Sequence, residues 1–138
     1  MFAALKMLFV YVVFGGAAGI LGVPYSFLIN DIGPLYRLAM RIMHAGVVAG
    51  GIRVEVVGRG NLPVGRSCIF MSNHVSNLDP PVLMPNLPGR SSILLKKSLM
   101  GIPILGTAMR MANFVPVERG HSVEAAKTSI AAAAIALR

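Results

Sequence analysis

The chain has 138 residues, of which 55% are hydrophobic and only 13% are charged, and it contains no tryptophan. This composition is too apolar for an ordinary soluble domain, and the chain is too long for a simple membrane anchor. The formal net charge of +8 favours anionic lipid surfaces and phosphate-bearing substrates. The basic residues are scattered and form no dense Lys/Arg tract, which argues against a nucleic-acid-binding protein.

Residues 7–29 carry no charge. At about 1.5 Å per residue, a helix of this length reaches across a bilayer core of roughly 30 Å. A signal peptide is the competing interpretation, but no convincing small-residue cleavage site precedes Asp31. Gly15 and Gly19 are spaced for close approach of a second helix, and Pro24 favours a kink. A single span and a bent hairpin in one leaflet therefore both remain open.

Residues 34–49 are predicted to form an amphipathic helix. Its basic residues recur three and four positions apart, on one face: Arg37, Arg41 and His44. Leu38 and Ile42 are expected on the apolar side. Next to an apolar helix, this pattern favours an interfacial helix among lipid head groups, although a core helix with a solvated cationic edge fits nearly as well. The excess of arginine after residue 31 favours a cytoplasmic location for the residues that follow.

The remainder alternates predicted strands and helices, which indicates an α/β fold with a mainly parallel sheet and flanking helices. We expect Cys68, the only cysteine, to be a small buried residue of a central strand. The predicted strands are residues 52–57, 67–71, 93–95 and 114–117, and the predicted helices begin at Pro80, at about residue 104 and at residue 123. The predicted organisation is a membrane-associated helical region at 1–50 and a second domain at 51–138.

Residues 72–81, Ser-Asn-His-Val-Ser-Asn-Leu-Asp-Pro-Pro, carry the candidate chemistry of the chain. They place the imidazole of His74 and the carboxylate of Asp79 where a predicted strand gives way to a helix. Histidine titrates close to neutrality, so it can take up a proton and return it within one turnover, while a carboxylate fixes its tautomer. A separation of five residues does not suit one face of a helix, so the side chains meet only if the backbone turns between them.

The same residues also fit a purely structural role. Asp79 and Pro80 are typical of the N-cap and the first position of a helix. Asn73 and Ser76 are common turn formers. For an isolated His and Asp at this spacing, the structural role is the more frequent one.

Three sequence blocks together favour the catalytic role of His74 and Asp79 over the structural one. The His-x4-Asp run, residues 94–106 (Leu-Leu-Lys-Lys-Ser-Leu-Met-Gly-Ile-Pro-Ile-Leu-Gly) and residues 114–119 (Phe-Val-Pro-Val-Glu-Arg) occur in this order. They resemble the motifs of the glycerolipid acyltransferases, above all the bacterial 1-acylglycerol-3-phosphate acyltransferases. The resemblance covers roughly residues 51–138. Asn113 and Pro116 are mild departures from the second motif.

The third motif of that family, a Pro-Glu-Gly-Thr-Arg run that contributes to phosphate binding, does not occur before Arg138. The resemblance therefore implies that residues 51–138 are an incomplete acyltransferase domain. We expect the 138-residue chain by itself to be inactive or nearly so.

The resemblance implies a general base, His74, oriented by Asp79, and an arginine, Arg119, that grips the substrate phosphate. Asn73 is expected to shape the loop, and Lys96 and Lys97 to assist in substrate binding, although a lysine pair is usually just exposed to solvent. The implied reaction transfers a fatty acyl group from acyl-CoA or acyl-carrier protein to lysophosphatidate and requires no metal or redox cofactor. The three histidines likewise show no metal-ligand spacing.

The implied location is a membrane, in bacteria the inner membrane with the catalytic side cytoplasmic, and the implied partners include membrane lipids. Two alternatives remain open. The acceptor can be glycerol-3-phosphate or another lysophospholipid, or the chain can be a non-catalytic module that binds membranes.

Overall fold

The structure is a computed structural model that describes residues 2–63, 65–117, 127, 130, 131 and 134. The chain divides into two compact units, Met1–Ser91 and Ser92–Arg138. Arg119 and most of the alanine-rich helix expected after residue 122 lie outside the described residues.

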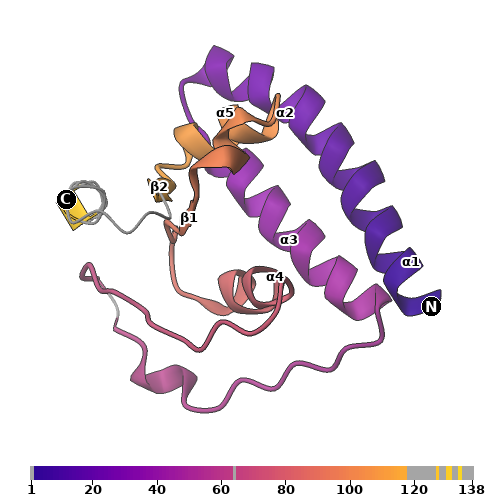
Figure 1. The fold of residues 1–138 in the computed structure, drawn as a ribbon, viewed down its shortest axis with the longest axis vertical. Coiled ribbons are helices and arrows are strands. Elements are labelled where there is room, and N and C mark those ends of the chain that lie inside the picture. Colours follow the sequence, from indigo (N-terminus) through magenta and orange to yellow (C-terminus); the bar gives the residue numbers. More distant parts are fainter. Residues whose placement is uncertain (1, 64, 118–126, 128–129, 132–133, 135–138) are drawn as a thin grey trace. The chain divides into compact units, whose positions relative to one another are not determined.

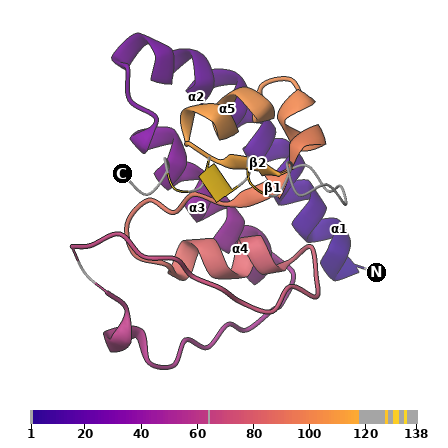
Figure 2. The ribbon, with the colours of Figure 1, turned by 60° about the vertical axis from the view of Figure 1, so that its left-hand side comes forward.

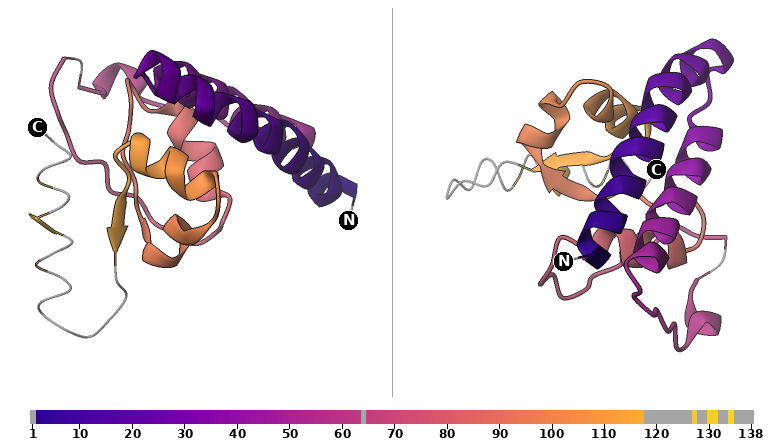
Figure 3. Two further views of the ribbon diagram at one scale, coloured as in Figure 1. Left: turned by 90° about the horizontal axis from the view of Figure 1, so that it is seen from above. Right: turned by 90° about the vertical axis from the view of Figure 1, so that its right-hand side faces the viewer.

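The first unit begins with a continuous helix, Phe2–Ile29, which is 28 residues long. It consists of α1 (Phe2–Phe9), one π-helical segment (Val10–Gly15) and α2 (Gly16–Ile29). Pro24 lies inside α2 without ending it, and the helix ends at Asn30, whose φ of 52° is left-handed. The chain then turns and α3 (Gly33–Ala49) runs back alongside the first helix, as Figure 1 and the right-hand view of Figure 3 show. No bend within residues 7–29 forms a hairpin.

The two antiparallel helices approach each other closely at glycines. A Cβ atom at Gly46 would collide with Cε1 of Tyr11, and one at Gly22 would lie 2.5 Å from Cδ1 of Leu35. At either position an added Cβ atom would require the facing side chain to move, so these glycines permit the packing as it stands. Gly15, whose spacing from Gly19 allows close approach of a second helix, does not meet α3, because nothing lies within 4 Å of its would-be Cβ atom. Spacing alone did not reveal which face of the first helix meets α3.

The first helix is largely uncovered on its outer side. Only 11% of its most apolar window is buried, and several large side chains are exposed. The most exposed include Phe2 (78%), Leu21 (72%) and Leu28 (85%). Within the described residues it is the helix that is long and apolar enough to cross a membrane, by length and composition alone.

The α3 helix is amphipathic, with a different apolar face from the predicted one. Its basic side chains are exposed as expected: Arg37, Arg41 and His44. The buried residues are Leu35, Tyr36, Gly46 and Val47. Leu38, which we expected on the apolar side, is 43% exposed. Leu35 and Gly46 meet the first helix, while the hydroxyl of Tyr36 bonds to the backbone of Ser91, so packing against these neighbours decides which residues of α3 are covered.

Two of the predicted strands are not formed. Residues 52–57 and 67–71 belong to no strand in the described part of the chain. Val57 is 86% exposed and Met71 is 93% exposed, while Cys68 is a half-buried free thiol. A strand exists only where a second strand supplies hydrogen-bond partners, and neither segment has such a partner among the described residues. The apolar pattern was present, but the pairing that it predicted was wrong.

A short helix follows these segments, as predicted. It begins with α4 (Asp79–Leu83) and continues as a 3₁₀ turn, Met84–Asn86. It packs against α3 with Met84 only 4% exposed, and Figure 2 shows the two elements within the first unit. The side chain of Asn86 donates to the carbonyl of Val82 (2.7 Å) and accepts from Arg59 (2.7 Å), which lies on a 3₁₀ turn, Arg59–Asn61. These two hydrogen bonds of Asn86 hold the C-terminal end of the helix that starts at Asp79.

The second unit contains the strands that the structure describes. β1 (Leu94–Lys96) and β2 (Val115–Val117) pair in parallel, with Leu94 opposite Val115. The connection consists of a 3₁₀ turn (Lys97–Gly101) and α5 (Leu105–Met111). This strand–helix–strand arrangement confirms the predicted parallel pairing and the predicted helix between these strands.

Candidate active site

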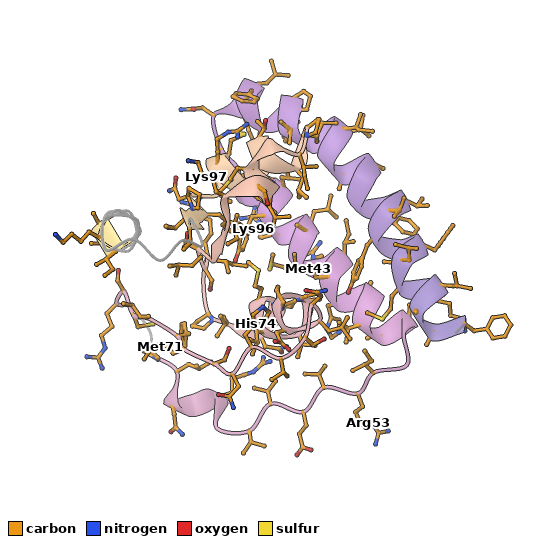
Figure 4. All side chains as sticks on the ribbon, in the orientation of Figure 1. Met43, Arg53, Met71, His74, Lys96 and Lys97 are labelled. Atoms are coloured by element: carbon orange, nitrogen blue, oxygen red, sulfur yellow. The ribbon has the colours of Figure 1, made fainter. Side chains whose placement is uncertain are left out.

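His74 and Asp79 are in direct contact. Nδ1 of His74 lies 2.7 Å from Oδ2 of Asp79. His74 belongs to an extended loop and Asp79 is the first residue of α4, beside which His74 is labelled in Figure 4. The backbone therefore makes the turn that a five-residue separation demands, and the imidazole and carboxylate form a hydrogen-bonded pair.

The turn between them is held by local hydrogen bonds. The backbone N–H of Leu78 donates to Oγ of Ser76 (3.1 Å), and that of Asp79 donates to the carbonyl of Ser76 (3.1 Å). Serine and asparagine favour such turns because their short polar side chains bond to nearby backbone. Pro80 and Pro81 then start α4 at once, since proline suits the first helical positions. The sequence thus brings the Asp79 carboxylate back towards His74.

One oxygen of Asp79 accepts three hydrogen bonds. Besides His74 Nδ1, Oδ2 accepts the backbone N–H of Val75 (2.9 Å) and that of Ser76 (3.0 Å). The carboxylate does not cap α4, which has no side-chain cap hydrogen bond. Pro80 and Pro81 have no N–H to offer it. The N-cap role that the sequence also allowed is therefore not what Asp79 does: its side chain orients the loop that carries the histidine.

These bonds keep Asp79 ionised. The pKa of Asp79 lies below its ordinary value, first because the Ser76 amide donates to the carboxylate and next because His74 does; burial opposes the shift, and the Val75 amide adds to it. An ionised carboxylate only accepts hydrogen bonds, so we assign the proton to Nδ1 of His74. Nε2 then carries the lone pair, which is the arrangement a general base needs.

Exposure leaves the imidazole accessible. The His74 side chain is 62% exposed, whereas that of Asp79 is 21% exposed. The carboxylate is thus more covered than the ring that it orients, and the ring is accessible to a substrate hydroxyl.

The remaining predicted residues are distributed over both units. Asn73 is exposed and directly precedes His74, with its role still a prediction. Lys96 ends β1 and Lys97 begins the following 3₁₀ turn, both exposed and both labelled in Figure 4. Arg119 lies outside the described residues. The structure brings His74 and Asp79 of this set into direct contact.

The roles of the backbone amides of Val75 and Ser76 were not predicted from the sequence. They hold the carboxylate, but a backbone N–H has no residue signature. The turn-forming serine at position 76 was the only available signal. In the described residues, no three His, Cys, Asp or Glu side chains are grouped so that they could hold a metal ion.

Residues 53–137, which include the His74–Asp79 pair, match the family described as Acyltransferase. The chain therefore belongs to this family of acyltransferases. Within it, the chain is similar to 1-acyl-sn-glycerol-3-phosphate acyltransferases, which confirms the resemblance inferred from the three blocks.

Two relatives illustrate the likeness. The chain is 35% identical to 1-acyl-sn-glycerol-3-phosphate acyltransferase alpha of Homo sapiens over 75 residues, which cover 54% of this chain and 26% of the relative. It is 29% identical to 1-acyl-sn-glycerol-3-phosphate acyltransferase of Borreliella burgdorferi over 82 residues, 59% of this chain and 33% of the relative. The chain thus spans about a quarter to a third of the length of the curated relatives it matches. No solved structure gives a significant match.

Proposed function

We propose that the protein takes part in acyl transfer to the free hydroxyl of 1-acylglycerol-3-phosphate, which yields phosphatidate for phospholipid biosynthesis. The observation that carries this proposal is the 2.7 Å contact between Nδ1 of His74 and Oδ2 of Asp79 in a member of the Acyltransferase family. The names of the relatives, 1-acyl-sn-glycerol-3-phosphate acyltransferases, support this acceptor.

His74 acts as the general base. Its Nε2 removes the proton from the acceptor hydroxyl as the oxygen attacks the carbonyl carbon of an acyl thioester. The negative charge of Asp79 stabilises the imidazolium that forms, while the amides of Val75 and Ser76 hold the carboxylate in place. When the tetrahedral intermediate collapses, the carbon–sulfur bond breaks and the imidazolium returns its proton to the thiolate. The products are the new ester and a free thiol.

The acyl donor is a thioester, acyl-CoA or acyl-carrier protein, and the reaction uses no metal or redox cofactor. Arg119 binds the phosphate of the acceptor, since a guanidinium group can contact two phosphate oxygens at once. Lys96 and Lys97 add positive charge for the same phosphate, and Asn73 shapes the loop that carries the base. The net charge of +8 supports an anionic substrate.

The protein acts at a membrane, where its lipid substrate resides. The exposed apolar side of Phe2–Ile29 supports insertion into lipid, and the exposed Arg37, Arg41 and His44 on α3 support contact with anionic head groups. In a bacterial cell this would be the inner membrane, with His74 on the cytoplasmic side.

An acceptor and donor panel tests the proposal. In a form of the protein that also carries the third motif, acyl transfer would be measured with lysophosphatidate, glycerol-3-phosphate and lysophosphatidylcholine, each with acyl-CoA and with acyl-carrier protein. Preferential use of lysophosphatidate supports the proposed acceptor, and preference for glycerol-3-phosphate contradicts it. Vesicle binding would be measured in parallel, because binding without any turnover would identify a membrane-binding module instead.

A further inference from the structure

Ser76 is bonded through its hydroxyl, its carbonyl and its amide to the residues at the start of α4. Its Oγ accepts the N–H of Leu78 (3.1 Å), and its carbonyl accepts the N–H of Asp79 (3.1 Å). Its own N–H donates to Oδ2 of Asp79 (3.0 Å). The residue is half-buried, whereas most of the loop around it is exposed. Ser76 therefore lies at the centre of the turn that joins His74 to Asp79.

The start of α4 has few backbone N–H groups that need a partner outside the helix. Such groups occur in the first turn of every helix, but the two prolines at the start of α4 carry none. The N–H of Val82 donates to the carbonyl of Leu78 (3.1 Å). The remaining N–H groups at this end are those of Leu78 and Asp79, and Ser76 accepts both. Ser76 thus fills the role of an N-cap residue, although it lies before the helix.

This arrangement leaves the carboxylate of Asp79 available for other partners. An aspartate at the start of a helix ordinarily accepts a backbone N–H of that helix. In α4 there is no such bond, and Oδ2 accepts instead from the imidazole of His74 (2.7 Å) and from two loop amides. The hydroxyl of Ser76 supplies an acceptor at the helix start, while the carboxylate holds the ring.

We infer that Ser76 is a positioning residue for the His74–Asp79 pair, and its catalytic consequence rests on the proposed function. Its hydroxyl fixes the amide of Leu78, which directly precedes Asp79, so it limits how far the carboxylate can move from the ring. A displaced carboxylate no longer selects one ring nitrogen for the proton of His74. A general base must also stay within hydrogen-bond distance of the proton that it removes. The hydroxyl thus keeps Nε2 of His74 unprotonated and in place.

The test is Ser76→Ala, which removes the hydroxyl and leaves the backbone groups that bond to Asp79. Ser76→Thr keeps a hydroxyl at the same position and is the conservative variant. Ser72→Ala is the matched control, because Ser72 is an exposed serine of the same loop whose hydroxyl bonds to no group in the described part of the chain. Amide NMR signals outside residues 74–79 would check that each variant is folded.

The position of the His74 proton gives the first readout, by nitrogen NMR of histidine-labelled protein at alkaline pH, where the ring is neutral. We expect Nδ1 to carry the proton in the unmodified protein, in Ser76→Thr and in Ser72→Ala. In Ser76→Ala we expect the ratio of Nδ1-protonated to Nε2-protonated ring to fall roughly three- to tenfold, which corresponds to the loss of one neutral hydrogen bond. The ratio should move towards that of the exposed His44. An unchanged ratio in Ser76→Ala overturns the positioning role.

Steady-state kinetics give the second readout, in a form of the protein that also carries the third motif. We expect Ser76→Ala to lower kcat roughly three- to tenfold and to leave KM for lysophosphatidate within about twofold, because the hydroxyl acts on the base and not on the acceptor. Ser76→Thr and Ser72→Ala should both keep kcat within about twofold of the unmodified form.

Two kinetic results overturn the role of the hydroxyl: an equal loss of kcat in Ser76→Thr and Ser76→Ala, or a rise in KM with kcat unchanged. If the unmodified form transfers no acyl group, the proposed function fails. The NMR result then still decides whether Ser76 positions the His74–Asp79 pair, because the site of the ring proton is measured without substrate.

Discussion

Oδ2 of Asp79 accepts Nδ1–H of His74 and, at the same time, the amide N–H groups of the two residues that follow the histidine. The carboxylate therefore orients both the ring and the backbone from which the ring projects. The side chain of Asp79 thus fixes the tautomer of His74 and also holds the loop that carries it.

Removing the imidazole should abolish acyl transfer. In a form of the protein that also carries the third motif and shows acyl transfer, we expect His74→Ala to lower kcat by about 10³-fold or more, since general base catalysis contributes about 10²- to 10⁴-fold. Initial rates with lysophosphatidate and acyl-CoA would be measured, with folding checked by circular dichroism. His44→Ala, which changes an exposed histidine on α3, is the matched control. Normal turnover by His74→Ala would rule out the mechanism.

Replacing the carboxylate by an amide should preserve the fold and impair the base. The amide oxygen introduced by Asp79→Asn would still accept from the loop amides, but it carries no negative charge to stabilise the imidazolium. We therefore expect Asp79→Asn to lower kcat roughly 10²- to 10⁴-fold. Asp31→Asn is the matched control, because Asp31 also accepts a backbone amide, that of Gly33 (2.7 Å). Comparable losses in both variants would point to a general structural effect and contradict the role of Asp79.

The lowered pKa of Asp79 predicts how stability depends on pH. In the unfolded chain an aspartate has a pKa of about 3.9, and folding lowers that of Asp79. The resulting stabilisation is fully present above about pH 3.9 and is lost as the pH falls through the lowered folded pKa. Denaturant unfolding of the unmodified protein and Asp79→Asn should therefore show a difference in unfolding free energy that shrinks below about pH 4. A difference that is constant with pH would contradict this.

Arg119→Ala should weaken binding of the phosphate group. Loss of a charged hydrogen bond to phosphate, at about 1.5–3 kcal/mol, corresponds to a rise in KM for lysophosphatidate of roughly 10- to 100-fold. The rise should be absent with monoacylglycerol, an acceptor without phosphate. An equal loss with both acceptors would rule out the phosphate-binding role.

Two glycines of the second unit should respond differently to an added methyl group. A Cβ atom at Gly106 would collide with the backbone carbonyl oxygen of Met100, so Gly106→Ala forces α5 away from the preceding turn. We expect a loss of about 1–3 kcal/mol in unfolding free energy, as for other overpacked sites. Gly101→Ala is the control, because nothing lies within 4 Å of that position. Thermal unfolding would compare them, and equal stability of the two variants would disprove the close contact.

Local patterns predicted the local elements. Residues 34–49, with basic residues three and four apart, form α3, and the segment between the two paired strands contains α5. The apolar runs near residues 94 and 115 form a parallel pair. In the helices, residues close in the chain supply the backbone hydrogen bonds, and the two strands are joined by one short crossover. Residue spacing was therefore enough to predict these elements.

The sequence alone determined the candidate catalytic groups and these local elements. It places an imidazole and a carboxylate five positions apart, with turn-forming residues between them and an uncharged helical segment earlier in the chain. Only the tertiary structure decided that Asp79 turns back to His74 and two backbone amides, and that Gly46, rather than Gly15, meets the opposing helix. It also decided that the hydroxyl of Tyr36 bonds to the backbone of Ser91. Residues 52–57 and 67–71 form no strand in the described part of the chain. The physical reason is that these contacts depend on backbone groups and on distant partners. A backbone amide looks the same at every position of a sequence, and a partner 55 residues away is chosen by how the chain packs.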